Sequence, residues 1–307
     1  MEQNKELEER LESAGFYEET STSSEVSSKY PIDAVLWAGS TPCCKEVVIA
    51  KSAEYGRMLF TDGELQSTEG DEAIYHEHLV HPAIMMYRSL YGDKPLRVCV
   101  LGAGEGATCR ELLKWSATVV REIIWNDFDK YLVDLCRDFM GYCPGQTAEI
   151  FYPNQRVIQL NMDACKFLKD ETLPLFDVVI CDLPDPVLDV VEGLYSPQFW
   201  KDMYTRMAPD CVVATHCGPI APASVDGMTL ASSVSDAMVE AGFTGPRLGK
   251  VAIPSYQSEW GFLFGIKTVN PTPYDMEMGI LPEGCRILDA DALSSFFRIP
   301  AYYSRVE

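Results

Sequence analysis

Two aspartates three positions apart, Asp182 and Asp185, form the sharpest chemical signal of the sequence. They end the run FDVVICDLPDP over residues 176–186, where an apolar strand leads into a loop that two prolines fix. Ligands of open α/β sheets bind outside the carboxyl ends of the strands, so both acids are expected to face a reacting carbon there. A carboxylate in this place can hold an amine and accept the proton that the amine must lose before it attacks carbon. The alternative is that one aspartate caps a helix and the other shapes a turn.

A glycine-rich turn precedes this motif in the chain. Residues 101–108 read LGAGEGAT and follow the apolar run RVCVL. Gly102 and Gly104 allow the backbone to approach a ligand closely. The GxGxG spacing differs from the GxGxxG of dinucleotide-binding turns. Glu105 in this turn repels a pyrophosphate and suits a ligand that ends in an amine.

Acids also follow the next two predicted strands. Asp127 ends the run IIWND, where a carboxylate can accept hydrogen bonds from both hydroxyls of a ribose. Asp163 lies in NMDA, with Ala164 beside it, and can accept from the amino group of an adenine. Each acid taken singly is also explained as a solvated turn residue. Together with Glu105 and its turn, they form the pattern of a site for an adenosylmethionine-type cofactor.

Three of the four histidines, His76, His78 and His81, lie within six residues. Their spacing suggests a zinc site as one interpretation. On a helix, however, His78 and His81 share a face and His76 lies on another, so a metal requires a kinked helix and a further ligand. We therefore expect no metal, and we interpret Tyr75 and His76 as walls of a substrate pocket.

The elements that must position these residues alternate between helix and strand. This alternation implies right-handed crossovers and an α/β fold with a mostly parallel, Rossmann-like sheet of the methyltransferase type. The predicted helices span 71–90, 108–115, 130–140, 164–169 and 196–207, and the predicted strands span 96–101, 122–127, 157–161, 176–182 and 211–216.

The rest of the chain divides into two smaller parts. Residues 1–30 are acidic and serine-rich, which predicts a short helix or a flexible tail. Two β-rich runs within residues 45–66 predict a small antiparallel unit, so a small N-terminal β domain is expected over 31–70. The Rossmann-like catalytic domain is expected over 71–307.

The net charge of -21 bears on the class of partner. So negative a protein repels phosphate backbones and attracts small cations, which disfavours nucleic acid as a partner. We find no apolar run of about 18 residues, and the sequence starts without the basic and apolar regions of a signal peptide. We therefore expect a cytoplasmic protein that has no membrane partner.

These motifs together resemble the spermidine/spermine synthase family of aminopropyltransferases, over roughly residues 45–260. Several segments, among them YHEHLVHPA, DLPDPV and PSYQSEWG, are most similar to the thermospermine synthase branch. The resemblance implies transfer of an aminopropyl group from decarboxylated S-adenosylmethionine to an amine such as spermidine, with release of methylthioadenosine. It also implies a small N-terminal β domain on a Rossmann-like domain, and assembly into homodimers.

The resemblance also implies roles for single residues. Asp182 matches the catalytic aspartate and Asp185 a ligand of the substrate amine. Glu105 matches the acid that holds the aminopropyl ammonium. Further matches are Asp127 to the ribose-binding acid, Asp163 to the adenine-binding acid, and Gln66, Tyr75, His76 and Tyr256 to positions that line the channel for donor and amine.

Two positions depart from the family pattern. Lys45 stands where the family usually has a glutamine near the donor, and His216 stands where a second glutamine is usual. Putrescine N-methyltransferases of plants use the same scaffold for methyl transfer. The alternative is therefore an N-methyltransferase that uses intact S-adenosylmethionine.

Overall fold

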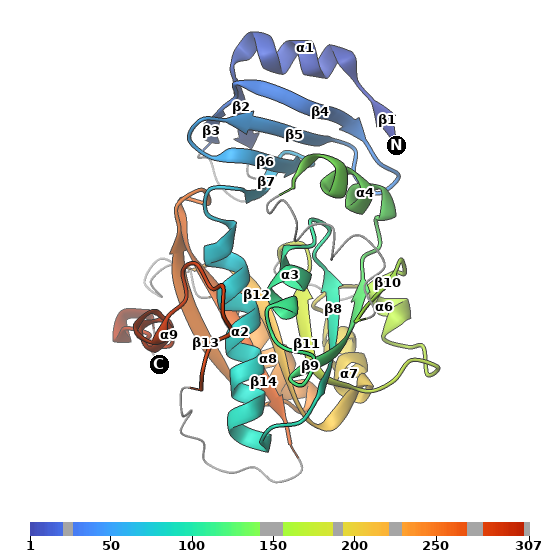
Figure 1. The fold of residues 1–307 in the computed structure, drawn as a ribbon, viewed down its shortest axis with the longest axis vertical. Coiled ribbons are helices and arrows are strands. Elements are labelled where there is room, and N and C mark those ends of the chain that lie inside the picture. Colours follow the sequence, from blue (N-terminus) through green and yellow to red (C-terminus); the bar gives the residue numbers. More distant parts are fainter. Residues whose placement is uncertain (21–26, 142–155, 187–192, 221–228, 269–278, 304–307) are drawn as a thin grey trace.

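The computed structural model describes residues 1–20, 27–141, 156–186, 193–220, 229–268 and 279–303. The chain forms a small N-terminal β domain that lies over one edge of a larger α/β domain (Figure 1). The predicted Rossmann-like fold with a small N-terminal β domain is therefore confirmed. No helix in the described part of the chain is long and apolar enough to cross a membrane.

The N-terminal domain is built on an antiparallel sheet of five strands in the order β1-β4-β5-β6-β7. Asp62 and Gly63 both have positive φ, 49° and 95°, and they join β6 to β7 in the two-residue hairpin geometry that matches strand twist. The strands span Glu2–Gln3, Ala34–Ser40, Val47–Ser52, Gly56–Thr61 and Glu64–Thr68.

Residues 1–20 and 27–31 belong to this domain, so the expected tail over 1–30 is corrected for these residues. Helix α1 (Lys5–Ala14) begins at Asn4, whose side chain accepts from the backbone N of Leu7, and ends at a left-handed Gly15. Leu7 and Leu11 lie four positions apart and are buried in the domain core. Strands β2 (Phe16–Thr20) and β3 (Ser27–Pro31) pair antiparallel beside it. The short helix, one of the two alternatives predicted for this segment, is therefore present, whereas strands β2 and β3 were not predicted.

The larger domain contains a seven-stranded sheet in the order β10-β9-β8-β11-β12-β14-β13. Its first five strands are parallel, and β14 and β13 add antiparallel at one edge. In chain order from β8 to β14 the strands span Leu96–Gly102, Val120–Asn126, Val157–Leu160, Phe176–Asp182, Met207–Ile220, Thr244–Ile253 and Ser258–Lys267.

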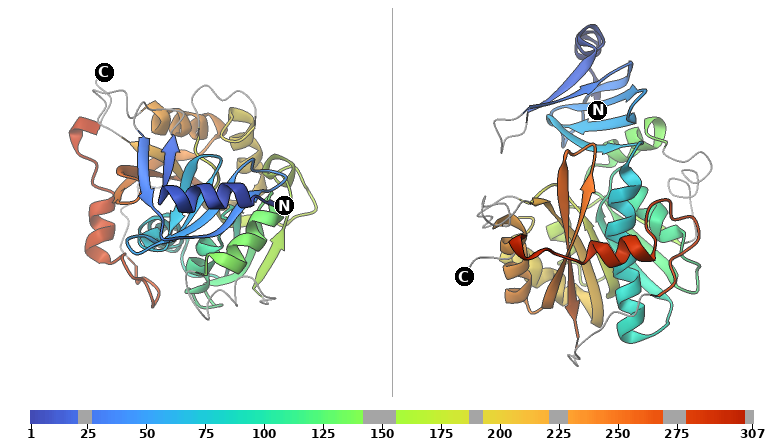
Figure 2. Two further views of the ribbon diagram at one scale, coloured as in Figure 1. Left: turned by 90° about the horizontal axis from the view of Figure 1, so that it is seen from above. Right: turned by 90° about the vertical axis from the view of Figure 1, so that its left-hand side faces the viewer.

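Helices cover both faces of this sheet, as Figure 2 shows. Val98 and Val100 of β8 point into the core that contains α2, α3 and α9, whereas Cys99 and Leu101 point into the core that contains α6, α7 and α8. The helices span Glu72–Tyr91 (α2), Ala107–Leu113 (α3), Lys130–Phe139 (α4), Ala164–Phe167 (α6), Pro197–Arg206 (α7), Thr229–Ala241 (α8) and Ala290–Phe296 (α9), and a 3-10 turn spans Ala301–Tyr303.

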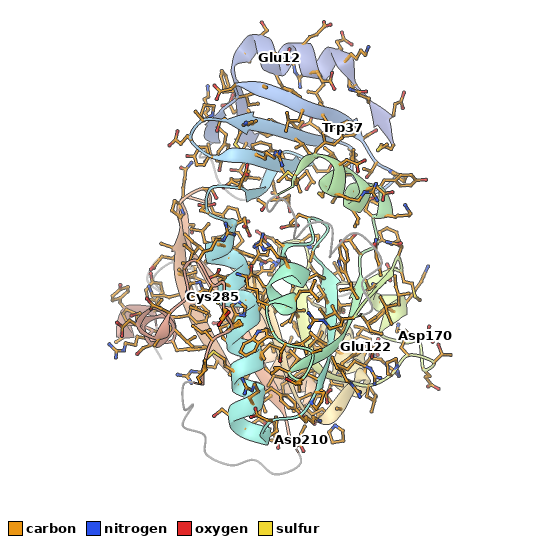
Figure 3. All side chains as sticks on the ribbon, viewed as in Figure 1. Glu12, Trp37, Glu122, Asp170, Asp210 and Cys285 are labelled. Atoms are coloured by element: carbon orange, nitrogen blue, oxygen red, sulfur yellow. The ribbon has the colours of Figure 1, made fainter. Side chains whose placement is uncertain are left out.

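The N-terminal domain is fastened to the carboxyl edge of the sheet through α4. Trp37 and Ile49 of the N-terminal sheet pack with Cys136 and Met140 in one apolar cluster. Figure 3 shows the side chains, Trp37 among them, that fill the space between that sheet and α4. The loops that follow β8, β9 and β11 are therefore held beneath the N-terminal domain.

Candidate active site

The glycine-rich turn after β8 is pressed against the end of β11. Gly102 has a φ of 83°, and a Cβ atom on it would lie 1.9 Å from the carbonyl oxygen of Asp182. The backbone N of Ala103, itself at a φ of 66°, donates to that same carbonyl over 2.9 Å. Only glycine at 102 allows this close approach, which sets Glu105 beside the end of β11.

Asp182 is held by two hydroxyl donors, one from each neighbouring helix. The Tyr75 hydroxyl on α2 donates to Oδ1 over 2.8 Å, and the Thr108 hydroxyl on α3 donates to Oδ2 over 2.5 Å. The side chain is 10% exposed. Each oxygen retains a further lone pair, so the carboxylate is fixed in orientation and can still accept a hydrogen bond from an amine.

His76 is a buried imidazolium between two glutamates. Its Nδ1 lies 2.8 Å from the carbonyl oxygen and 2.9 Å from the carboxylate of Glu72, and its Nε2 lies 3.1 Å from Glu105. Burial lowers the pKa of His76, but the hydrogen bonds and charges of Glu105 and Glu72 outweigh it and raise the pKa to about 10. Both ring nitrogens therefore donate, and Nε2 also lies 3.9 Å from Asp182.

The other two histidines of the cluster have separate partners. His78 donates from Nδ1 to the carbonyl of Ile74 over 2.7 Å, and burial lowers the pKa of this histidine to about 4. The indole of Trp115 donates to Nδ1 of His81 over 3.1 Å, so His81 donates from Nε2 to Glu111 over 2.9 Å. Across the described ranges, no three His, Cys, Asp or Glu side chains are grouped as metal ligands.

Asp127, at the end of β9, is a buried carboxylate among other acids. Burial raises its pKa to about 7, and the charges of Asp129, Glu105 and Asp182 add to the rise, although the backbone N of Asp129 donates to it over 2.8 Å. Ligand groups that donate hydrogen bonds or carry positive charge are needed to stabilise this anion.

Asp163 and Ala164 lie at the start of α6, after β10. Asp163 caps this helix by accepting from the backbone N of Lys166 over 3.0 Å. The loop before it is fixed by Asn126, whose side chain both accepts from the backbone N and donates to the carbonyl of Met162 over 2.9 Å. The adenine-binding role of Asp163 stays a prediction.

The predicted channel residues come together at the junction of the two domains. The Tyr256 hydroxyl donates to the backbone carbonyl of Gln66 over 2.5 Å and its ring lies 6.3 Å from that of Tyr75. Trp260 packs 4.7 Å from the ring of Tyr256. Strand β7, helix α2 and the β13–β14 turn therefore contribute to one aromatic-lined region.

Asp185 lies beside His216 on the same side of the sheet. Its Oδ1 is 3.7 Å from Nδ1 of His216, and its side chain is 45% exposed whereas that of the histidine is 3% exposed. Burial raises the pKa of Glu64 on β7, and the charge of Asp185 adds to the rise. The second aspartate of the motif therefore faces the N-terminal domain.

Two sequence comparisons bear on this arrangement. Residues 72–272 match the spermine/spermidine synthase domain, and residues 15–69 match the spermidine synthase tetramerisation domain. The chain belongs to the spermine/spermidine synthase family. The family that the motifs predicted is thus confirmed.

Relatives of this family cover most of the chain. A polyamine aminopropyltransferase of Synechococcus sp. (strain JA-2-3B'a(2-13)) is 29% identical over 275 residues, which are 85% of this chain and 83% of the relative. Polyamine aminopropyltransferase 2 of Pseudomonas aeruginosa is 33% identical and covers 76% of this chain and 62% of its own length. Thermospermine synthase ACAULIS5 of Arabidopsis thaliana is 27% identical and covers 81% of this chain and 68% of its own length.

Solved structures share the fold. The spermidine synthase of Thermotoga maritima aligns with a TM-score of 0.75 at 19% identity, over 93% of this chain and 91% of its own. A spermidine synthase in complex with the transition-state analogue AdoDATO aligns with a TM-score of 0.76 at 18% identity, with the same coverage. At these identities the likeness shows the fold alone.

The two departures from the family pattern occupy different environments. Lys45 is exposed in the β4–β5 connection, and we find no ion-pair partner for it among the described residues. Its neighbours reach the site instead, since the Thr41 hydroxyl donates to Asp129 and the Cys44 thiol lies 3.9 Å from it. His216 is buried.

Sequence reasoning missed the groups that support the predicted acids. Thr108 lies in the glycine-rich segment 101–108, but no role was predicted for it. It stands in the first turn of α3, from where its hydroxyl reaches Asp182 at the end of the neighbouring strand β11. The ion pairs of the buried Glu72, with the buried Arg110 and the exposed Arg286, had no local signal in the sequence. These three residues lie far apart in the sequence, and charged residues are predicted to be exposed unless they are paired.

Proposed function

We propose that this member of the family transfers the aminopropyl group of decarboxylated S-adenosylmethionine to a polyamine, with spermidine as the acceptor and thermospermine or spermine as the product. The observation that carries the proposal is Asp182, fixed by Tyr75 and Thr108 at the strand end beside Glu105. The names of the relatives, polyamine aminopropyltransferase and thermospermine synthase, support the same reaction class.

The donor is proposed to lie along the carboxyl ends of β8, β9 and β10. The carboxylate of Asp127 accepts from the ribose hydroxyls, and Asp163 with Ala164 contacts the adenine. Gly102 and Gly104 let the donor approach the backbone, and the rim of the site includes Gln66. Glu105 holds the terminal ammonium by a charge-assisted hydrogen bond.

The acceptor amine is proposed to enter between Tyr75, Tyr256 and the two aspartates of the loop after β11. Asp182 accepts one proton from the attacking nitrogen, and Asp185 binds the amine. The freed lone pair forms the new N–C bond while the C–S bond breaks, and its electrons stay on sulfur as the neutral thioether methylthioadenosine. His76 lies beside the reacting region as a fixed positive charge that balances Glu105.

Mass spectrometry of the products tests the reaction. The protein is incubated with spermidine or putrescine and with either the decarboxylated or the intact donor. A gain of about 57 Da marks aminopropyl transfer and a gain of about 14 Da marks methyl transfer. Methylation, or no product from either donor, would overturn the proposal, and methylation would establish the N-methyltransferase alternative.

Assembly into a homodimer through the N-terminal domain is part of the proposal. The match of residues 15–69 to a tetramerisation domain supports association of copies, and the exact number is open to measurement. We also propose a cytoplasmic location, with neither nucleic acid nor membrane as partner. Light scattering on the purified chain distinguishes a dimer from a monomer or a tetramer.

A further inference from the structure

Asp129 stands at the start of helix α4 and receives hydrogen bonds from two parts of the protein. Its Oδ1 accepts from the backbone N of Tyr131 over 3.0 Å and from that of Leu132 over 3.2 Å, which caps the helix. Its Oδ2 accepts from the hydroxyl of Thr41 in the β4–β5 connection, and the Cys44 thiol lies 3.9 Å from the same atom. Asp129 is 5% exposed. Both oxygens of this buried carboxylate are therefore satisfied within the protein.

Asp127, two residues earlier in the chain, is a second buried carboxylate with fewer partners. Its Oδ1 accepts from the backbone N of Asp129 over 2.8 Å. Its Oδ2 faces the glycine-rich turn, where a Cβ atom on Gly104 would lie 3.4 Å from it, and we find no donor to this oxygen among the described residues. Asp127 is therefore the acid of this pair that can accept from a ligand, and Asp129 is the residue that holds it in place.

The hydroxyl of Thr41 is itself fixed by the turn in which it lies. Its oxygen accepts from the backbone N of Cys44 over 2.9 Å and from that of Cys43 over 3.2 Å, and the backbone N of Thr41 donates to the carbonyl of Cys44 over 3.0 Å. Two N–H groups occupy the lone pairs of the hydroxyl, so its hydrogen is directed to Asp129. The bond to the carboxylate is charge-assisted, which makes it strong and directional.

A second side chain of the N-terminal domain contacts the other end of α4. Arg57 of β6 donates from Nη1 to the carbonyl of Met140 over 2.9 Å and to that of Gly141 over 3.1 Å. Both contacts fasten the N-terminal domain to the helix. Of the two side chains, only Thr41 contacts the residue whose backbone N donates to Asp127.

We propose that Thr41 is a positioning residue of the donor site, which fixes the carboxylate of Asp127 for the ribose hydroxyls by way of Asp129. The inference rests on the proposed function, because the ribose belongs to the adenosyl donor. Without the hydroxyl, Oδ2 of Asp129 keeps only a thiol, which is a weak donor. The buried carboxylate then turns towards other donors, and the backbone N that holds Asp127 moves with it. The N-terminal domain thus serves donor binding as well as the association of copies.

Calorimetric titration with methylthioadenosine tests the proposal without turnover. This neutral molecule carries the ribose and adenine of the donor but neither its sulfonium charge nor its aminopropyl group. Affinity should fall by at least about tenfold in Thr41→Val, equivalent to roughly 1.4 kcal/mol. Thr41→Ser keeps the hydroxyl and should bind within about twofold of the wild type. Thr41→Cys, which puts a weaker donor in the same place, should also bind less tightly and serves where the valine variant does not fold.

Arg57→Met is the matched control, because it removes the contact at the other end of α4 and keeps a long side chain there. Urea unfolding should show that Thr41→Val and Arg57→Met both lower stability, whereas only Thr41→Val should lower the affinity for methylthioadenosine. A double-mutant cycle tests the route through Asp129. In an Asp129→Asn background the charge-assisted bond is already lost, so Thr41→Val should weaken binding by less than about threefold.

Steady-state kinetics separates this role from a general loss of structure. In Thr41→Val the KM for the donor should rise at least about tenfold, while the KM for spermidine should stay within about twofold of the wild type. Unchanged affinity for methylthioadenosine in Thr41→Val, or an equal loss in Arg57→Met, overturns the role of Thr41. A wild type that binds no methylthioadenosine overturns the ribose site and the role of Thr41 with it. Loss of affinity confined to Thr41→Val, with no transfer by the wild type from either donor, supports the role of Thr41 and overturns the proposed reaction.

Discussion

Replacement of Asp127 by asparagine is expected to stabilise the ligand-free protein while it weakens binding of the adenosyl donor. The carboxylate is buried among Asp129, Glu105 and Asp182, and burial together with these charges raises its pKa from 3.8 to about 7. An asparagine carries no charge, and its amide oxygen can still accept from the backbone N of Asp129. The variant therefore loses the electrostatic penalty and keeps the local hydrogen bond.

The size and pH range of this effect follow from the pKa of Asp127. Between pH 3.8 and about 7 the folded chain holds a proton that the unfolded chain has lost, so the free energy of unfolding decreases as the pH rises. Each pH unit contributes about 1.4 kcal/mol. The electrostatic penalty of the wild type is absent below pH 3.8 and reaches on the order of 4 kcal/mol above about pH 7.

Urea unfolding of both ligand-free proteins from about pH 4.5 to about pH 8.5 measures the penalty. The stability difference, Asp127→Asn minus wild type, should grow with pH up to about 7 and then stay level. Asp163→Asn is the matched control, because asparagine caps a helix as well as aspartate does, and its difference should stay within about 0.5 kcal/mol. A difference for Asp127→Asn that does not change with pH, or that shows destabilisation at pH 8, would refute this account of Asp127.

Four further outcomes are expected. Asp182→Asn should lower turnover by roughly 10²–10⁴-fold and leave donor affinity nearly intact, and wild-type turnover in that variant would remove Asp182 from catalysis. The decarboxylated donor should bind at least about tenfold more tightly than the intact donor, because the extra carboxylate of the intact donor would face Glu105. Calorimetry should give the same preference in Lys45→Gln. Tighter binding of the intact donor by the wild type, lost in Lys45→Gln, would favour methyl transfer. His76→Gln should destabilise the protein most below pH 6.5, and this loss of stability should shrink as the pH rises towards about 10, because Glu72 and Glu105 stabilise the imidazolium form of the wild type. A loss of stability that grows with pH in thermal unfolding would contradict this. EDTA should leave activity unchanged, and a loss that zinc restores would overturn the metal-free reaction.

The fold could be predicted where the hydrophobic pattern of a segment and the turn residues at its ends agreed. The apolar run before Asp182 predicted strand β11 with the observed bounds, and the glycine-rich turn marked the end of β8. Strand β12 is longer than predicted, Met207–Ile220 against 211–216, because Met207 pairs with Phe176 of β11 at its start and pairing with β14 extends it past His216 through a bulge. Such pairing is a tertiary effect that the local sequence does not encode.

The candidate site was predictable as a set of acids but not as a network. Acids at strand ends can be located from the sequence, because topology places the carboxyl ends of parallel strands at one edge. Their protonation states cannot be predicted in this way, because the pKa of Asp127 depends on its burial and on acids that other strands and turns contribute. The imidazolium state of His76 likewise needs Glu105, which lies 29 positions away in the chain.

The distribution of positive charge separates the structural acids of this protein from those proposed to bind ligands. The acids of α2 and α3 are buried and each has a cation beside it, so the protein supplies their counter-charges and they stabilise the fold without a ligand. Of the acids at the strand ends, Asp182 is held by two hydroxyl groups and Asp127 by a backbone N–H, and the cation beside Glu105 is His76. A sulfonium donor with a terminal ammonium and a polyamine acceptor bring positive charge to these acids, which agrees with the raised pKa of the buried Asp127. The pairs of the first group are Glu72 with Arg110 and Arg286, Glu77 with Lys114, and Glu111 with Arg110 and Lys114.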